Sequence, residues 1–201
     1  SYGYVWSDTD LEEDMYYQWL DIDINDDNLV SFPNNDFSSE QIPIGFEFKF
    51  YGQQYSNIIV NPNGWIGFGE DNTEFNNTSL PSNSAPRPAI FGYWDDLNPV
   101  AIDPGGCSNN GSGLVYKQNL GDKFVVWYNN VVRCTSNPDL SGTFDFQIVL
   151  HSNGDIDINY RNMSGNTTSG TVGMQNTDGT IAIVNAYDSD YVESEKTIQY
   201  K

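Results

Sequence analysis

The chain has 201 residues, of which 28 are acidic and 8 are Lys or Arg, so its formal net charge is −20. This charge argues against nucleic acid and anionic membrane surfaces as partners, because both attract positively charged proteins. No run of about 18 apolar residues occurs, so the sequence predicts no membrane insertion.

The N-terminal part predicts one strand after an irregular beginning. Residues 1–17 form an acidic, irregular segment with a short candidate strand at 4–6. Residues 19–24 read W-L-D-I-D-I, and this alternation predicts a strand with its apolar side chains on one face. A polar connection follows at 31–41.

Residues 42–68 contain the clearest strand signal. In FEFKF, phenylalanines alternate with charged residues, which is the pattern of a half-buried strand. A second apolar run follows at 58–60 and a third at 65–68. Asn63-Gly64 between these two runs predicts a hairpin whose central residues both have φ > 0.

The rest of the chain continues as short strands and turns. A loop rich in Pro, Ser and Asn spans 69–88. Further strands are predicted at 89–94, 114–117, 124–128, 143–150, 156–160, 171–175, 181–186 and 197–200. About ten to eleven short strands joined by Gly and Asn turns predict an all-β protein, an antiparallel two-sheet β-sandwich of jelly-roll type. We expect a single domain over residues 1–201.

The two cysteines, Cys107 and Cys134, flank the predicted hairpin 114–133. They lie equally far from the centre of its turn, so in a simple hairpin register they would face each other near the open end. We therefore predict a Cys107–Cys134 disulfide, which would staple the loop at 103–113 and fit an oxidising compartment. The alternative is two free, buried thiols in a cytosolic protein.

Residues that could support catalysis are sparse. The single histidine, His151, follows a predicted strand and precedes an Asn-Gly turn, as a surface residue would. No GxSxG motif, zinc-ligand cluster or Gly-rich phosphate-binding motif occurs. Asp95 and Asp96 are the most suggestive carboxylate pair, but adjacent strand residues point to opposite faces. We expect them to cap the following turn or to bind a metal, and we predict no enzymatic activity.

Calcium is the metal that the acidic residues favour. Residues 21–28 alternate acidic and amide side chains but lack the Gly and Glu that an EF-hand loop needs. The looser run at 7–14 could surround Ca²⁺. The candidate ligands are Asp8, Asp10, Asp95 and Asp96. A second interpretation of the negative charge is that it keeps the protein soluble in a saline or calcium-rich medium. This interpretation is compatible with calcium binding.

Aromatic residues outside the strands are candidate ligand contacts. The chain has five Trp and 13 Tyr, and a ring beside amides and carboxylates suits a sugar, whose hydroxyls those groups can bond. The candidates are Tyr4, Trp6, Tyr16 and Tyr17 near the N-terminus, and Tyr187 and Tyr191 near the C-terminus. The alternative is that these rings cover the edges of the fold. Three tryptophans within alternating strands are expected in the core: Trp65, Trp94 and Trp127.

Several segments carry a resemblance to a known kind of domain. They are PIGFEFKFYG, the NGWIGFG hairpin, FGYWDDLNP, FVVWYNNV, FQIVLHSNGDIDINYRNM and TVGMQNTDG. Together they resemble a β-sandwich module of secreted bacterial multidomain proteins that often lies beside peptidases and adhesive repeats. The chain more distantly resembles the nidogen-type (NIDO) extracellular domain, through the NG-aromatic-I-x-F hairpin and the later F-W-D-D strand end.

This resemblance covers nearly the whole chain from Trp19 to Ala186 and brings no catalytic residues. It implies a non-catalytic accessory or adhesive module. The acidic N-terminal segment and the cysteine-bearing insertion at 103–113 depart from the pattern.

The prediction for function is a non-catalytic extracellular module for recognition or adhesion. Its expected partners are a polysaccharide, an extracellular matrix or cell-surface protein, and neighbouring domains of a larger secreted protein, with Ca²⁺ as a candidate cofactor. The alternatives are a structural or assembly module of a secreted protein or surface fibre and, less favoured, a carboxylate-dependent hydrolase. The N-terminus has no basic region or apolar core, so any secretion signal is expected to lie upstream or to have been removed.

Overall fold

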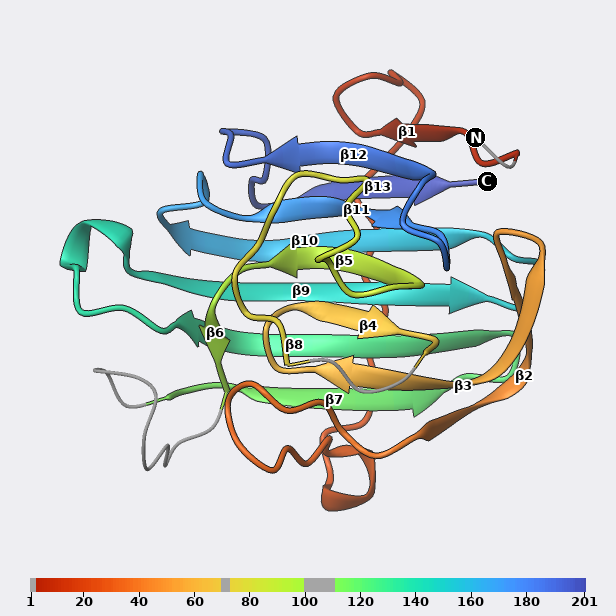
Figure 1. The fold of residues 1–201 in the computed structure, drawn as a ribbon, viewed down its shortest axis with the longest axis horizontal. Coiled ribbons are helices and arrows are strands. Elements are labelled where there is room, and N and C mark those ends of the chain that lie inside the picture. The colour runs from red at the N-terminus through yellow and green to blue at the C-terminus, as the bar shows by residue number, and fades with distance from the viewer. Residues whose placement is uncertain (1–2, 70–72, 100–110) are drawn as a thin grey trace.

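The computed structural model describes residues 3–69, 73–99 and 111–201. These residues form two antiparallel β-sheets, which lie one behind the other in Figure 1. Thirteen strands occur within the described part of the chain. The expected two-sheet β-sandwich is therefore confirmed, with somewhat more strands than predicted.

The seven-stranded sheet lies at the back of Figure 1 and has the order β1-β13-β10-β9-β8-β6, with β7 also paired to β8. Its strands are β1 (Trp6–Asp8), β6 (Leu97–Asn98), β7 (Leu114–Asn119), β8 (Lys123–Arg133), β9 (Gly142–His151), β10 (Ile156–Gly165) and β13 (Lys196–Tyr200).

The six-stranded sheet lies in front and has the order β12-β11-β5-β4-β3-β2. Its strands are β2 (Ile42–Phe50), β3 (Gln53–Asn61), β4 (Trp65–Gly67), β5 (Ala89–Trp94), β11 (Thr171–Gln175) and β12 (Ala182–Tyr187). The helices of the described residues are two short 3₁₀ turns, η1 (Asp26–Asn28) and η2 (Pro138–Leu140).

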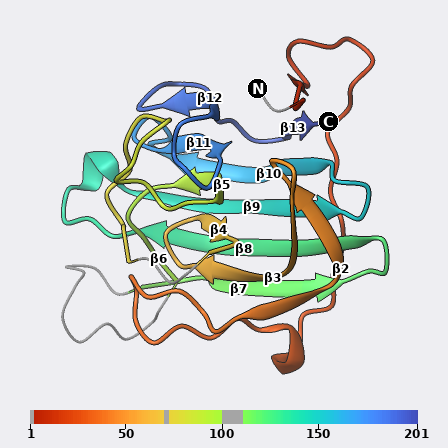
Figure 2. The ribbon, with the colours of Figure 1, turned by 45° about the vertical axis from the view of Figure 1, so that its right-hand side comes forward.

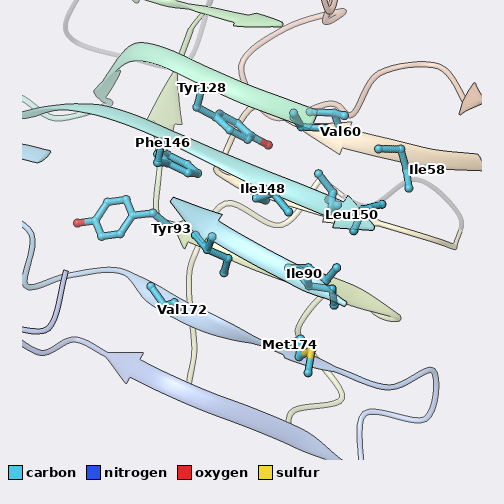
Figure 3. Close-up of a cluster of buried hydrophobic side chains, with 14 of the residues drawn as sticks. Ile58, Val60, Ile90, Tyr93, Tyr128, Phe146, Ile148, Leu150, Val172 and Met174 are labelled. Carbon is cyan, nitrogen blue, oxygen red and sulfur yellow. The ribbon is translucent and has the colours of Figure 1, made fainter. Parts of the chain in front are cut away.

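Apolar side chains from both sheets meet between them, as Figure 3 shows. Tyr128 of β8 stacks on Phe146 of β9, with the ring centroids 4.6 Å apart. Two hydroxyls also bond across the core: Tyr128 donates to the Asn61 carbonyl and Tyr160 to the Gly92 carbonyl, both at 2.6 Å. Gly92 also leaves room for the Phe146 ring, because a Cβ at residue 92 would lie 2.7 Å from it.

The turn between β3 and β4 differs from the expected one. Gly64 has φ = +86°, but Asn63 is not in the positive-φ region. Side-chain amides hold the turn instead: Asn61 Oδ1 accepts the N–H of Asn63, and Asn63 Oδ1 accepts the N–H of Leu97, both at 2.9 Å. Asn63 therefore connects this turn to β6 of the other sheet.

The prediction of a strand at 19–24 is wrong. These residues have no regular secondary structure. They belong to a segment, residues 15–30, that crosses the outer face of the seven-stranded sheet behind the strands in Figure 1 (compare Figure 2); we call it the strap. The strap follows a row of side chains from neighbouring strands, Thr197, Asn159, Gln147, Trp127 and Tyr116. In W-L-D-I-D-I the side chains alternate because one side of the strap lies against the sheet, although its backbone does not pair as a strand.

Gln147 takes the place of a neighbouring strand as the partner of the strap. Its buried amide accepts a hydrogen bond from the Leu20 N–H at 3.3 Å and donates one to the Leu20 carbonyl at 2.7 Å. The guanidinium of Arg161 lies over the rings of Trp19 and Trp127, 4.4 and 4.8 Å from their centroids. Trp127 is therefore buried between sheet and strap, not between the two sheets.

The outer face of the six-stranded sheet is also covered. Residues 73–88 pass in front of this sheet in Figure 1. Beneath them lies a second apolar cluster, made of Ile59, Trp65, Leu80, Ala85, Ala89, Phe91 and Trp94. Trp65 and Trp94 are buried as expected, but in this cluster on the outer face.

The disulfide prediction assumed a hairpin register that the structure does not have. β7 and β8 pair with Asn119 opposite Phe124, and the end of β8 pairs with β6. Cys107 and residues 103–110 lie outside the described residues, so the pairing with Cys134 stays a prediction.

Candidate functional site

The antiparallel pairing of β1 with β13 brings together two segments far apart in the sequence. Asp8 of β1 lies opposite Ile198 of β13, so the acidic N-terminal turn adjoins the start of β13 and the connection that precedes it. A pocket of about 190 Å³ opens here, and we call it the edge pocket. It is lined by Asp10, Asp190, Tyr191, Glu193 and Lys196.

A buried lysine lies at the centre of the edge pocket. The side chain of Lys196 is 3 % exposed, and its ammonium donates to Asp10 Oδ2. The ammonium also lies 3.9 Å from Asp8 Oδ2 and 3.8 Å from Glu193 Oε1. It sits 4.1 Å from the centroid of the Tyr191 ring, in cation–π contact. Three carboxylates around one ammonium leave this site with an excess of negative charge.

Asp8 holds several groups of this site in place through hydrogen bonds. It is buried, and its Oδ1 accepts the backbone N–H groups of Asp10 and Leu11, both at 3.0 Å. Its Oδ2 accepts the hydroxyl of Tyr191. Burial and then this hydrogen bond to a carboxylate raise the pKa of Tyr191 well above its ordinary value. Asp10, whose side chain is 53 % exposed, is the more accessible of the two predicted metal ligands here.

At the edge pocket the structure brings a predicted ligand-contact residue, Tyr191, against a predicted metal ligand, Asp8. Trp6, Tyr16 and Tyr187 are 37, 71 and 42 % exposed, so their rings are accessible to a partner. Within the described residues, no ring contact joins these three into one platform.

Tyr4 and Tyr17 are less accessible than the exposed rings. The Tyr4 hydroxyl donates to the carbonyls of Lys49 and Gly154, at 3.1 and 3.3 Å. Tyr17 is half-buried, and burial raises its pKa to about 12. Both rings are therefore held against the protein.

Asp95 and Asp96 directly follow β5, and Asp95 is the more deeply buried of the two. Asp95 is buried, and its Oδ2 accepts from Arg133 Nε at 2.8 Å and from the Ser169 hydroxyl at 2.7 Å. Its Oδ1 accepts the N–H of Asp96 at 2.9 Å. Asp95 therefore caps the turn, which was one of the two roles expected for it. Arg133 also donates to the Tyr93 hydroxyl at 2.6 Å. Asp95 is thus the anionic half of a buried ion pair.

His151 also has a carboxylate partner, since its Nε2 lies 2.8 Å from Asp157 Oδ2. Among residues 3–69, 73–99 and 111–201, no group of three or more His, Cys, Asp or Glu side chains is arranged to hold a metal ion. No helix in these ranges has the length and apolar character needed to cross a membrane.

Sequence reasoning did not identify Lys196 or Glu193 as site residues. Both lie in the acidic run SDYVESEK, which reads as an ordinary solvated connection. Only the pairing of β1 with β13 places Asp8 and Asp10 beside this lysine. No local signal in the sequence reports that pairing.

Comparison with known families places this fold. The family model described as NIDO related matches residues 15–200. The chain belongs to the NIDO-related family. The match covers the strap and every strand from β2 to β13, whereas β1 and the turn containing Asp8 and Asp10 precede it. No curated protein and no solved structure matches the chain.

Proposed function

We propose that this NIDO-related chain is a non-catalytic extracellular recognition or adhesion module that binds a glycan or a matrix protein. Family membership supports an extracellular module. The observation that carries the proposal is the edge pocket, where Tyr191 and accessible carboxylates surround a buried ammonium at an open edge of the sandwich.

The position of the pocket supports this role. The strap covers much of one outer sheet face, and residues 73–88 cover part of the other. The edge pocket lies beside β1, an edge strand of its sheet, and beside the connection that follows β12, an edge strand of the other sheet. Side chains there are open to a partner, and the connection that carries Asp190, Tyr191 and Glu193 joins β12 to β13.

The chemistry of the edge pocket suits a ligand rich in hydroxyl or ammonium donors. Asp190 and Glu193 are exposed, and carboxylates accept hydrogen bonds from both kinds of group. The same oxygens suit Ca²⁺, which takes carboxylate and carbonyl ligands. Calcium dependence is therefore part of the proposal that the EDTA arm of the experiment tests, with no set of three carboxylates among the described residues assigned to the ion.

A second candidate function is assembly within a larger secreted protein or fibre. The observation that favours it is β12, which pairs only with β11 in the described sheet and exposes Val184 and Tyr187. An exposed edge strand can pair with a strand of another chain or a neighbouring domain.

The test is retention of the purified chain on insoluble polysaccharides and immobilised matrix proteins, in Ca²⁺ and again in EDTA. The variant Asp190→Asn/Glu193→Gln should lose most of the retention, because it removes two exposed charges of the edge pocket. The control Asp178→Asn/Glu47→Gln removes two exposed carboxylates elsewhere on the surface.

Retention that falls only in the edge-pocket variant supports the proposal, and loss in EDTA supports its calcium part. Equal retention of both variants, or none on any surface, would overturn recognition at this site. A concentration-dependent oligomer that Val184→Lys abolishes would instead support assembly through β12.

A further inference from the structure

A second pocket lies at the other end of the β1–β13 pair. The β2–β3 turn, the β9–β10 turn and the end of β13 meet there, on the right-hand side of Figure 1. The pocket has a volume of about 210 Å³. We call it the lysine pocket; its principal lining residues are Tyr4, Lys49, Tyr51, Asn153, Asp155 and Lys201.

Lys49 and Lys201 stand out in a chain with so few cations. Within the described residues, no carboxylate lies within 4.0 Å of either ammonium, and the same holds for Arg87, Lys117 and Lys123. Arg133, Arg161 and Lys196 each pair with an aspartate. In a chain with 28 acidic residues and 8 Lys or Arg, two lysines without a carboxylate partner line the same small pocket. With Asp155 included, the lining side chains carry one net positive charge, in a chain whose net charge is −20.

The acidic residue of the lysine pocket is engaged within its own turn. Asp155 Oδ2 accepts from Asn153 Nδ2 at 2.8 Å, and the Asp155 N–H donates to Asn153 Oδ1 at 3.1 Å. The carboxylate is thereby directed to the turn.

Tyr51 supplies a hydroxyl that lacks a partner. The residue is 91 % buried, and its hydroxyl makes no hydrogen bond within the described structure. Its ring packs edge-on against Phe50 and Tyr4, at 4.8 and 5.5 Å between centroids. A buried hydroxyl without a partner is unfavourable, and an acceptor that reached it from the pocket would satisfy it. Burial raises the pKa of Tyr51 to about 12, so it remains a proton donor at neutral pH.

We propose that the lysine pocket binds a carboxylate or sulfate group, as carried by an acidic polysaccharide. Lys49 and Lys201 neutralise the anion, Tyr51 donates a hydrogen bond to one of its oxygens, and the Tyr4 ring forms an apolar wall beside it. The small volume fits one anionic substituent or one sugar ring of a polymer. This site is separate from the edge pocket, so its ligand class does not depend on the function proposed there.

The experiment is titration calorimetry of the whole chain at low salt, because salt screens exposed charges. The probes are dextran sulfate, polygalacturonate and uncharged dextran, with sodium sulfate as a competitor. We expect Lys49→Gln/Lys201→Gln to weaken binding of an acidic probe about tenfold, since charge-assisted hydrogen bonds are lost. Tyr51→Phe should weaken it about threefold or more, because one hydrogen bond is lost.

The matched control is Arg87→Gln/Lys117→Gln, which removes two positive charges away from the pocket. Unchanged affinity in this control supports a defined site, and the preferred probe tells sulfate from carboxylate. Competition by sodium sulfate alone would show that the anion itself is the ligand.

Equal weakening by both double variants would mean bulk electrostatic attraction and overturn the proposal. Absence of binding to either acidic probe, or unchanged affinity in Lys49→Gln/Lys201→Gln, would also overturn it. Equally tight binding of uncharged dextran would show that the charge of the probe is not recognised and would also overturn the proposal. The retention assay with the edge-pocket variant tests the other site independently.

Discussion

At the scale of single residues, polar groups placed inside apolar layers determine how the sheets stack. Tyr128 and Tyr160 each bury a ring between the sheets and bond a carbonyl of the opposite sheet with the hydroxyl. Burial raises the pKa of both hydroxyls well above its ordinary value, so they stay neutral donors. Each tyrosine thus contributes packing and one directional bond across the core.

Removal of one such hydroxyl should be costly. Tyr160→Phe keeps the ring but leaves the Gly92 carbonyl without this donor, so we expect the free energy of unfolding to fall by about 1–3 kcal/mol. Urea denaturation followed by tryptophan fluorescence measures the change. Tyr16→Phe serves as a control, because that ring is 71 % exposed. Equal stability of the two variants would contradict a structural role for the cross-core bond.

The site residues show how far single-residue reasoning extends. Asp8, Asp10 and Tyr191 were identifiable as polar or aromatic residues in irregular segments, and the structure brings them together. Lys196 and the partner of Asp95, Arg133, were not identifiable, because each pairs with a residue far along the chain. Side-chain type is visible in the sequence, whereas these long-range neighbours are not.

At the scale of elements, the strap shows that an alternating pattern need not form a strand. Its backbone is held by side chains of the sheet: Gln147 bonds Leu20, and Gln118 accepts the N–H of Asp23 at 2.8 Å. These amides take the place of a β-ladder. The strap therefore depends on a few polar side chains. We expect their loss to detach the strap from the sheet without unfolding the two sheets.

The variant Gln147→Leu tests this dependence. It leaves the N–H and carbonyl of Leu20 without their partner, so we expect amide exchange at Leu20 to accelerate and stability to fall by about 1–3 kcal/mol. Hydrogen exchange read by NMR distinguishes the strap from the strands. Gln54→Leu, at an exposed position of β3, is the control. Unchanged protection at Leu20 would show that packing alone holds the strap.

At the scale of the whole molecule, acidity and buried phenols together govern the response to pH. Burial is the largest cause of raised pKa values in eight tyrosines: Tyr4, Tyr17, Tyr51, Tyr93, Tyr128, Tyr160, Tyr191 and Tyr200. In an unfolded chain a tyrosine ionises with a pKa of about 10. The folded state therefore binds these protons more tightly than the unfolded state.

This difference predicts alkaline unfolding. The tyrosine contribution to stability is fully present below about pH 10. It is lost as the pH rises from there through the folded-state pKa values, by up to about 1.4 kcal/mol per pH unit for each tyrosine. Urea denaturation at a series of pH values, with tyrosinate absorbance recorded in parallel, measures it. Full ionisation of the tyrosines near pH 10 in a chain that stays folded and equally stable would contradict the prediction.

The sequence by itself determined the all-β class, most strand positions and the extracellular NIDO-like resemblance, because alternation, turn residues and local motifs are short-range signals. Only the tertiary structure decided that residues 19–24 form a strap, that Trp65 and Trp94 lie outside the main core, and which side chains line the two pockets. These features depend on the pairing of β1 with β13 and on side chains that bond across sheets. Such contacts join residues more than a hundred positions apart, and their energy arises only after the chain has folded.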